Sequence, residues 1–412
     1  MKVEGLRTTE RNGRRRVVAT ITWEDSDRPA QDIYFEIPLE FGGALTADYD
    51  AFVVAAIIPA LWHAERRFVV DGPLCPTLHD GLRVAMAWIR ESRRLAHPPL
   101  TVEARHRQVV HRASERGACF LSGGIDSLSM LRRNRLDYPR SHPASIRDGI
   151  IAFGLEVEQP EAFTHVVDNL MPVAEDADVE LIPVYTNIRA LEPSWSVWTD
   201  VWQGAVWAAI AHALKRRLTL AYLASSTSIP YLKSLQGTDP RLDPNYSSEE
   251  LLFRHDGIAL SRFAKTRLVA DWPVALAHLR VCNESARYQT GKLNCGRCEK
   301  CVRTQLALLC LGALDGTDVF QTVDLSEAAV RAVVMSRHNY WYASYEQLIE
   351  PLEAIGRRDL SRLAAARVAM SKPPRWRREL AEVDRRHLGG ALRRIRALFW
   401  RESRGGHEAN GT

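Results

Sequence analysis

The sequence predicts an α/β fold, with a parallel sheet covered by helices on both faces, in the middle of a chain of 412 residues. Two observations lead to this prediction. Between Arg116 and about Cys310, short apolar runs rich in β-branched residues alternate with segments of helical periodicity. The length also suits two or three domains. We therefore expect an α+β N-terminal domain (1–112), a central domain (113–315) and a helical, Arg-rich C-terminal region (316–412).

The N-terminal domain is predicted to begin with a β-hairpin. RRVVATITWE and QDIYFEIPLE are rich in strand-forming residues, alternate in part between polar and apolar positions, and flank a polar turn. Helical patterns follow at 48–67 and 79–92, and 97–105 indicates a turn and a strand. No cluster of catalytic residue types occurs here, so the expected function rests on the central domain.

The central elements follow one another in regular order. The predicted strands are GACFL (117–121), DGIIAFGLE (148–156), VELIPVYTN (179–187), LTLAYLASS (218–226) and LLFRHDG (251–257). The predicted helices cover 126–135, 160–174, 198–216 and 261–272, and 230–248 is a turn-rich insertion. Strand–helix alternation produces parallel sheets, whose ligands bind beyond the carboxyl ends of the strands.

Composition favours a globular protein without a membrane anchor. The chain is 46% hydrophobic and 25% charged. Its most apolar segment, Ala51–Trp62, is shorter than the roughly 20 residues that span a bilayer. The charged N-terminus is followed by no apolar stretch of the kind found in secretion signals. We expect no transmembrane segment and a cytoplasmic location.

The stretch CFLSGGIDSLSML, 119–131, is the most informative corner of the chain. Its polar core, Ser122–Ser127, lies between a predicted strand and a predicted helix. Adjacent glycines allow backbone N–H groups to turn toward a ligand, and a helix N-terminus adds further amides and positive dipole. With the hydroxyls of Ser122 and Ser127, these groups form a nest for phosphate oxygens. Neither the GxxxxGK[ST] nor the GxGxxG nucleotide motif is present at this corner.

SGGIDS resembles the SGGxDS loop of the PP-loop family, the N-type ATP pyrophosphatases. The resemblance implies that the loop binds the β- and γ-phosphates of Mg-ATP and that ATP is cleaved to AMP and pyrophosphate. Asp126 either helps to hold Mg²⁺ or only caps the helix. By this resemblance the catalytic residues are Ser122, Asp126, Ser127 and Lys265, and the ATP-binding residues, beside Phe120, are Leu121, Ser122, Gly123, Gly124, Ile125, Asp126, Ser127, Phe153, Gly154 and Leu155.

A second motif, NCGRCEKC, suggests a metal site. Cys295, Cys298 and Cys301 are spaced as CxxCxxC, and Cys282 lies 13 residues upstream of the first. Four thiolates suit tetrahedral Zn²⁺. An iron–sulfur cluster or free thiols are the alternatives. Cys310 lies in an apolar helical pattern and is expected to be a core residue.

The two motifs together resemble 7-cyano-7-deazaguanine synthase, a nitrile-forming PP-loop family. That resemblance implies a structural zinc bound by Cys282, Cys295, Cys298 and Cys301 close to the active site. It covers about 116–310. This chain departs from the family in its N- and C-terminal additions of about 100 residues each and in the insertion at 230–248, so the deazaguanine substrate itself is not implied.

Polar residues at later strand ends are candidates for contacting the acceptor substrate. Ser225, Ser226 and Thr227 end the fourth predicted strand, and Asp256 ends the fifth. Arg262 shares a helical face with Lys265, and a cation there neutralises phosphate charge. An exposed helical face is the alternative reading for both. Trp195, Trp198 and Trp202 recur at helical spacing and are expected to be core residues rather than a base-stacking platform.

The C-terminus is strongly basic. From Arg357 onward, 14 Arg and one Lys face six acidic residues, a net charge of +9 in a chain of net charge +5. Such a segment is either a solvated helical face or a surface for RNA, membrane or a protein partner.

These observations predict an AMP-forming ligase. ATP would activate a carboxylate or carbonyl oxygen of a small acceptor substrate, and ammonia or another amine would displace AMP. The expected cofactors are ATP, Mg²⁺ and Zn²⁺. The alternatives are a tRNA-modifying PP-loop enzyme, which thiolates or ligates, and a non-catalytic nucleotide-sensing module of a larger assembly.

Overall fold

A computed structural model of the chain describes residues 1–108, 116–282, 284, 288, 291–333 and 339–371. The predicted boundary at 112/113 and the basic residues from 372 onward lie outside these ranges. Within the described part of the chain, none of the helices combines the length and apolar character that crossing a bilayer requires.

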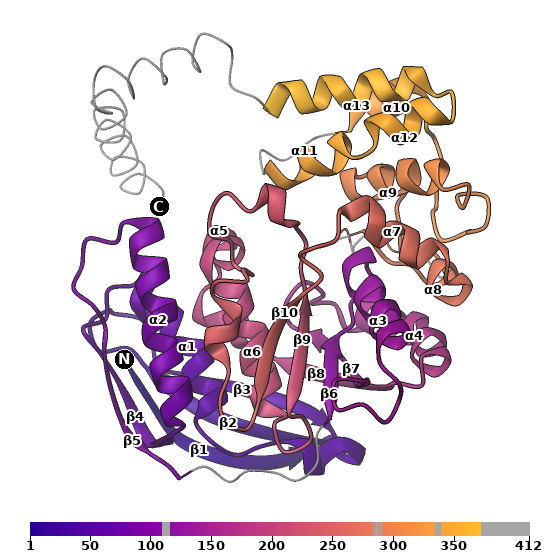
Figure 1. Ribbon diagram of the computed structural model, residues 1–412. Coiled ribbons are helices and arrows are strands. Elements are labelled where there is room, and N and C mark those ends of the chain that lie inside the picture. The colour runs from indigo at the N-terminus through magenta and orange to yellow at the C-terminus, as the bar shows by residue number, and fades with distance from the viewer. Residues whose placement is uncertain (109–115, 283, 285–287, 289–290, 334–338, 372–412) are drawn as a thin grey trace, which may run out of the picture.

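The chain is built on one sheet of ten strands with helices on both faces (Figure 1). The strands are β1 (Lys2–Arg11), β2 (Arg14–Thr22), β3 (Gln31–Pro38), β4 (Arg67–Leu74), β5 (Thr101–His106), β6 (Gly117–Phe120), β7 (Ile146–Phe153), β8 (Glu180–Thr186), β9 (Leu220–Ala224) and β10 (Leu252–Asp256). Their order is β10-β9-β6-β7-β8-β3-β2-β1-β4-β5. The α/β fold class is therefore confirmed, as a mixed and mostly parallel sheet.

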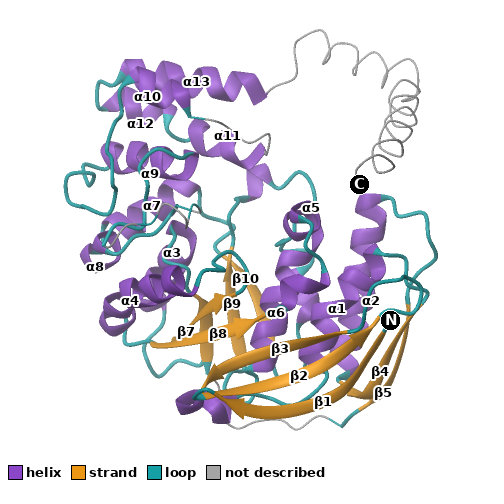
Figure 2. Cartoon of the chain, turned by 180° about the vertical axis from the view of Figure 1, so that it is seen from behind, coloured by secondary structure: helices purple, strands orange, loops and turns teal. Residues whose placement is uncertain are grey.

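The predicted central strands are the parallel part of this sheet, β10 to β8. The predicted hairpin is also present, since β2 pairs antiparallel with β3. β3 in turn pairs antiparallel with β8, so that the N-terminal strands extend the central sheet without a break (Figure 2). The three predicted domains remain a prediction, but the first two share one sheet.

Two N-terminal strands and one helix end differ from the prediction. The predicted helix at 48–67 ends at Trp62, because Arg67 already begins β4. Neither β1 nor β4 was predicted. β1 is largely polar and exposed, so its side chains give no strand pattern, and its pairing with β2 holds it in the sheet. Tertiary pairing decides such strands more than intrinsic preference does.

The helices cover the two faces of the central strands. They are α1 (Asp50–Trp62), α2 (Pro76–Arg93), α3 (Ile125–Asp137), α4 (Pro160–Asp176), α5 (Trp195–Val197), α6 (Gln203–Ala213), α7 (Arg262–Ala270), α8 (Pro273–Ala277), α9 (Glu299–Cys310), α10 (Glu327–Ala332), α11 (Asn339–Glu346), α12 (Ile349–Ala354) and α13 (Arg358–Ser371). Short 3₁₀ segments are η1 (Leu39–Ala44), η2 (Ile188–Leu191), η4 (Ile229–Tyr231) and η5 (Asp243–Tyr246), and Trp198–Trp202 (η3) is π-helical. The predicted helix at 198–216 is thus divided at Gln203.

Successive side chains of β6 point to opposite faces of the sheet and pack into two different hydrophobic cores. Ala118 and Phe120 join the core of α1, α2 and α6, whereas Cys119 packs with α3, α4 and α7–α9. This alternation is the two-residue period of a strand buried on both faces. The helices α10–α13 add a third core against α9. The SGGIDS loop, at the end of β6, therefore lies where the two main cores meet.

Candidate nucleotide and metal site

The SGGIDS loop joins β6 to α3 at the carboxyl edge of the sheet. From β6 the chain first moves outward to β7 and β8, then crosses back to β9 on the other side of β6. The loop therefore lies at a topological switch point, where open α/β sheets bind ligands. The first N–H groups of an α-helix have no partner within the helix, and in α3, which begins at Ile125, the N-cap residue Gly124 has no side chain to accept from them.

Internal hydrogen bonds hold the loop in its shape. The hydroxyls of Ser122 and Ser127 lie 3.2 Å apart, and Ser127 also accepts the Ser122 N–H at 3.3 Å and donates to the Gly124 carbonyl at 3.1 Å. Gly123 has a φ of +79°, and a Cβ there would lie 3.0 Å from the Leu170 side chain. The backbone conformation thus favours glycine at 123, and a larger residue would also require Leu170 to shift.

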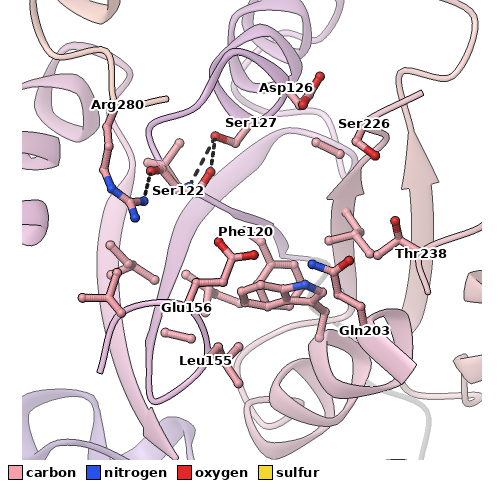
Figure 3. Close-up of a pocket in the computed structure, with 18 of the residues that line it drawn as sticks. Phe120, Ser122, Asp126, Ser127, Leu155, Glu156, Gln203, Ser226, Thr238 and Arg280 are labelled. Carbon is pink, nitrogen blue, oxygen red and sulfur yellow. Dashed lines mark hydrogen bonds between the residues drawn. The ribbon is translucent and has the colours of Figure 1, made fainter. Parts of the chain in front are cut away.

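A cavity of about 280 Å³ opens over this loop (Figure 3). One wall comes from the loop and the ends of β6 and β7, including Phe120, Leu121, Ser122, Asp126, Ser127, Leu155 and Glu156. A second, adjoining wall comes from the α5–α6 region, including Trp195, Trp198, Thr199, Gln203 and Trp207, and from Thr238 of the insertion. The first wall carries the polar side chains of the SGGIDS loop, and the second, called the aromatic wall below, carries three tryptophans.

The insertion at 230–248 is packed against the aromatic wall. The Gly237 N–H donates to the Thr199 carbonyl at 2.7 Å, and the Gly204 N–H donates to the Gly237 carbonyl at 2.6 Å. A Cβ on Gly237 would lie 2.5 Å from the Trp198 carbonyl oxygen, so only glycine permits this approach. The contact places Thr238, the next residue, on the cavity wall.

A smaller cavity of about 120 Å³ adjoins the first and connects it with the cysteine cluster. The two share Ser122, Asp126, Glu156, Ser226, Arg280 and Lys300. The smaller one is also lined by Arg262, Arg303 and Cys282. Four cations and two carboxylates therefore surround the space beside the N-terminus of α3, an arrangement that attracts anions.

Asp126 lies at the centre of this charge cluster. Its carboxylate is ion-paired with Arg262, and the Lys265 Nζ lies 3.5 Å from Oδ1. Burial alone would raise the pKa of Asp126, but the two cations outweigh burial and hold the pKa below its ordinary value. The ion pairs thus favour the charged form of the Asp126 carboxylate beside the loop.

The four predicted cysteine ligands form a compact group. All four sulfurs lie within 4.8 Å of one another. The Sγ separations are 3.5 Å for Cys298–Cys301, 3.8 Å for Cys282–Cys298 and 4.0 Å for Cys295–Cys301. Tetrahedral zinc with Zn–S bonds of about 2.3 Å requires sulfurs about 3.8 Å apart. The prediction that these thiols can hold a metal ion such as zinc is confirmed.

The structure brings many of the predicted site residues to these two cavities. Phe120, Leu121, Ser122, Asp126, Ser127, Leu155 and Ser226 line the larger one, and Gly124, Ile125 and Arg262 line the smaller one. Gly123 faces Arg280 and Leu170. Gly154, with a φ of +90°, makes the turn that precedes Leu155 and Glu156.

Other predicted residues lie behind the cavity walls. Phe153 packs against Phe163 and Tyr185, and the buried Lys265 donates to the Ser225 carbonyl. The Ser225 hydroxyl donates to the Thr227 carbonyl at 2.9 Å. These residues, with Thr227 and Asp256, lie outside the residues that line the two cavities. The Asp256 carboxylate is ion-paired with Arg133, and the neighbouring His255 is paired with Asp243.

Several lining residues were not anticipated from the sequence: Glu156, Gln203, Thr238, Arg280 and Lys300. Two of them could have been found from the sequence, because Arg280 and Lys300 each lie within two positions of a predicted zinc ligand. Trp198 and Trp202 are buried, as expected, whereas Trp195 is 55% exposed at the cavity rim.

Comparisons with protein-family models, curated proteins and solved structures found no match to this chain. The resemblance to PP-loop enzymes therefore rests on the motifs themselves. What the structure adds is the strand–loop–helix context of SGGIDS, an adjoining cavity and a four-cysteine cluster able to hold a metal ion.

Proposed function

We propose that this chain is an ATP pyrophosphatase of the PP-loop type, which activates an acceptor substrate by adenylation. The observation that carries the proposal is the position of SGGIDS between β6 and α3, at the switch point of the sheet and on the wall of a cation-rich cavity. Phosphate groups are bound in this way by helix N-termini and glycine-rich loops.

The loop supplies the groups that phosphate recognition needs. The first N–H groups of α3 and the hydroxyls of Ser122 and Ser127 are the candidate donors to the β- and γ-phosphates. Mg²⁺, when bound, neutralises charge on these phosphates, and the ionised Asp126 is its candidate ligand. Lys265 lies behind Asp126 and orients it rather than meeting substrate directly.

The reaction proceeds in two displacements. An oxygen of the acceptor attacks the α-phosphorus, the bond between that phosphorus and the bridging oxygen of the β-phosphate breaks, and pyrophosphate leaves with the electron pair. An amine nitrogen then attacks the activated carbon, AMP leaves, and the nitrogen loses a proton to solvent. Little covalent chemistry falls to the protein, whose part is positioning and charge stabilisation.

The aromatic wall is the candidate site for the rest of the substrates. Trp207 packs against Phe120, and Gln203 and Thr238 add polar groups beside these rings (Figure 3). Apolar rings combined with a few well-placed polar groups are typical of small-molecule sites, and this cavity offers both. The acceptor is a small carboxylate or carbonyl compound, as in enzymes similar to 7-cyano-7-deazaguanine synthase, and Ser226 and Arg262 are its candidate contacts.

Product analysis tests this proposal. Zinc-loaded protein is incubated with Mg-ATP, ammonium and a small-molecule extract of its host, and nucleotides are separated by chromatography. AMP and pyrophosphate are expected, and they disappear in Ser122→Ala and Asp126→Ala. Ser129→Ala is the matched control, because its buried hydroxyl only donates to the Asp126 carbonyl within α3. ADP as the product would contradict the proposal.

A further inference from the structure

The cysteine cluster joins two segments that each place a cation on the cavity walls. Arg280 lies two residues before Cys282, and Lys300 lies directly before Cys301. Both side chains line the larger and the smaller cavity. Each of the two short segments therefore carries both a cation that lines the cavities and at least one cysteine of the cluster.

The first of these segments holds the phosphate loop in place. The Arg280 N–H donates to the Gly123 carbonyl at 2.8 Å, and its guanidinium donates to the Ser122 carbonyl at 3.0 Å. The guanidinium also donates to the Tyr288 hydroxyl at 2.8 Å. Arg280 is thus a positioning residue, which connects the loop to the segment that carries Cys282.

The second segment begins α9. Cys298 is the N-cap, Lys300 lies in the first turn, and Cys301 follows it. Asn294 ties this segment to the first one, because its side-chain carbonyl accepts the N–H groups of Val281 and Cys282 at 2.7 and 3.2 Å. A metal ion bound by all four sulfurs closes this arrangement and fixes the start of α9 relative to the phosphate loop.

We propose that Lys300, which lines the same cavity as Gly124 and Ile125 of the loop, binds the pyrophosphate portion of ATP, and that the cysteine cluster acts in catalysis by positioning Lys300 and Arg280. The identification of the anion rests on the proposed function. The geometry itself requires only an oxyanion, since a carboxylate of the acceptor would meet the same cations. Arg262, Arg280 and Arg303 line the smaller cavity together with Lys300.

Binding of inorganic pyrophosphate to the zinc-loaded protein, measured by calorimetry, tests the role of Lys300. A charge-assisted hydrogen bond contributes enough that Lys300→Gln is expected to weaken binding by about 10- to 100-fold. Lys300→Arg should retain most of the affinity. Arg297→Gln is the matched control, because Arg297 lies between two of the same cysteines but is exposed. Wild-type affinity in Lys300→Gln would overturn the proposal.

Two further experiments distinguish pyrophosphate from carboxylate binding and test the role of the metal. Malonate titrated in place of pyrophosphate reports on carboxylate binding, and a Lys300 effect on malonate alone would contradict the assignment to pyrophosphate. Removal of zinc by a chelator should weaken pyrophosphate binding, and readdition of zinc should restore it. Unchanged pyrophosphate affinity in the metal-free, folded protein would show that the cluster does not position Lys300.

These measurements do not depend on turnover. Lys300-dependent pyrophosphate binding without AMP formation would leave the inference standing and remove the proposed function. AMP formation with pyrophosphate binding that does not depend on Lys300 would support the proposed function and contradict the role of Lys300. Circular dichroism and the melting temperature of each variant show whether a loss of binding reflects a loss of the fold.

Discussion

Asp126 is the residue at which charge links stability to the candidate chemistry. It lies in the first turn of α3, where a carboxylate interacts favourably with the helix dipole, and it is paired with Arg262 and Lys265. Burial raises its pKa, whereas these cations lower it, and the lowering prevails. The two cations therefore allow a largely buried carboxylate to remain charged next to the phosphate loop.

This pKa shift predicts a pH-dependent contribution to stability. A folded-state pKa below the unfolded value of about 3.9 gives stabilisation that is fully present above that pH and is lost as the pH falls through the folded pKa. The difference in unfolding free energy between wild type and Asp126→Asn should be constant from about pH 7 to pH 5 and shrink below about pH 4. Denaturant titrations at each pH measure it.

Asp318→Asn provides the comparison. Asp318 forms an ion pair with Lys292, but its side chain is 90% exposed. The unfolding free energy of Asp318→Asn should therefore differ little from that of wild type at every pH. A wild-type advantage over Asp126→Asn that persisted unchanged into strong acid would contradict the ion-pairing account.

At the scale of elements, α9 connects the cysteine cluster with the C-terminal helices. Its first turn carries Cys301, and its later residues Val302 and Leu306 pack in the core of α10–α13. Arg303 donates to the Ser344 hydroxyl of α11 at 3.1 Å. α9 is thus a direct structural link between the cysteine cluster and the C-terminal helices.

Metal content provides a direct test of this assignment. The purified, reduced protein should contain one zinc per chain, and Cys282→Ser should lose most of it because a hydroxyl is a poor substitute for a thiolate ligand. Cys310→Ser should retain it, since Cys310 at the end of α9 lies outside the cluster. Elemental analysis measures both variants. Full zinc in Cys282→Ser, or its loss in Cys310→Ser, would contradict the assignment.

At the scale of the whole molecule, the N-terminal region completes the central sheet and core. β3 covers the edge of β8, and α1, buried from Asp50 to Leu61, packs on α6. Trp202 beneath the aromatic wall donates its indole N–H to the Ala55 carbonyl at 2.9 Å. The buried Lys215 is paired with Asp48 and Asp50 across the same interface.

A chain that begins at residue 113 is therefore expected to aggregate, because it exposes the edge of β8 and the apolar face of α6. Size-exclusion chromatography and near-ultraviolet circular dichroism report on its state. Co-expression with residues 1–112 should restore a soluble complex. That result would show that the fragment aggregates because the surface contacted by the N-terminal region is exposed, and not because the chain has been divided. A monomeric fragment that unfolds cooperatively by itself would contradict this view of the interface.

The sequence alone determined those features whose signal is local. The strand GACFL, the loop SGGIDS, the helix after it and the cysteine spacing are contiguous or nearly so, and their chemistry follows from residue type. Only the tertiary structure decided that β1 and β4 join the sheet, that Lys265 and Asp256 lie behind the cavity walls, and that Arg280, Lys300, Gln203 and Thr238 line them. The physical reason is that long-range pairing and packing of segments place these residues, and such contacts leave no periodicity in the sequence around them.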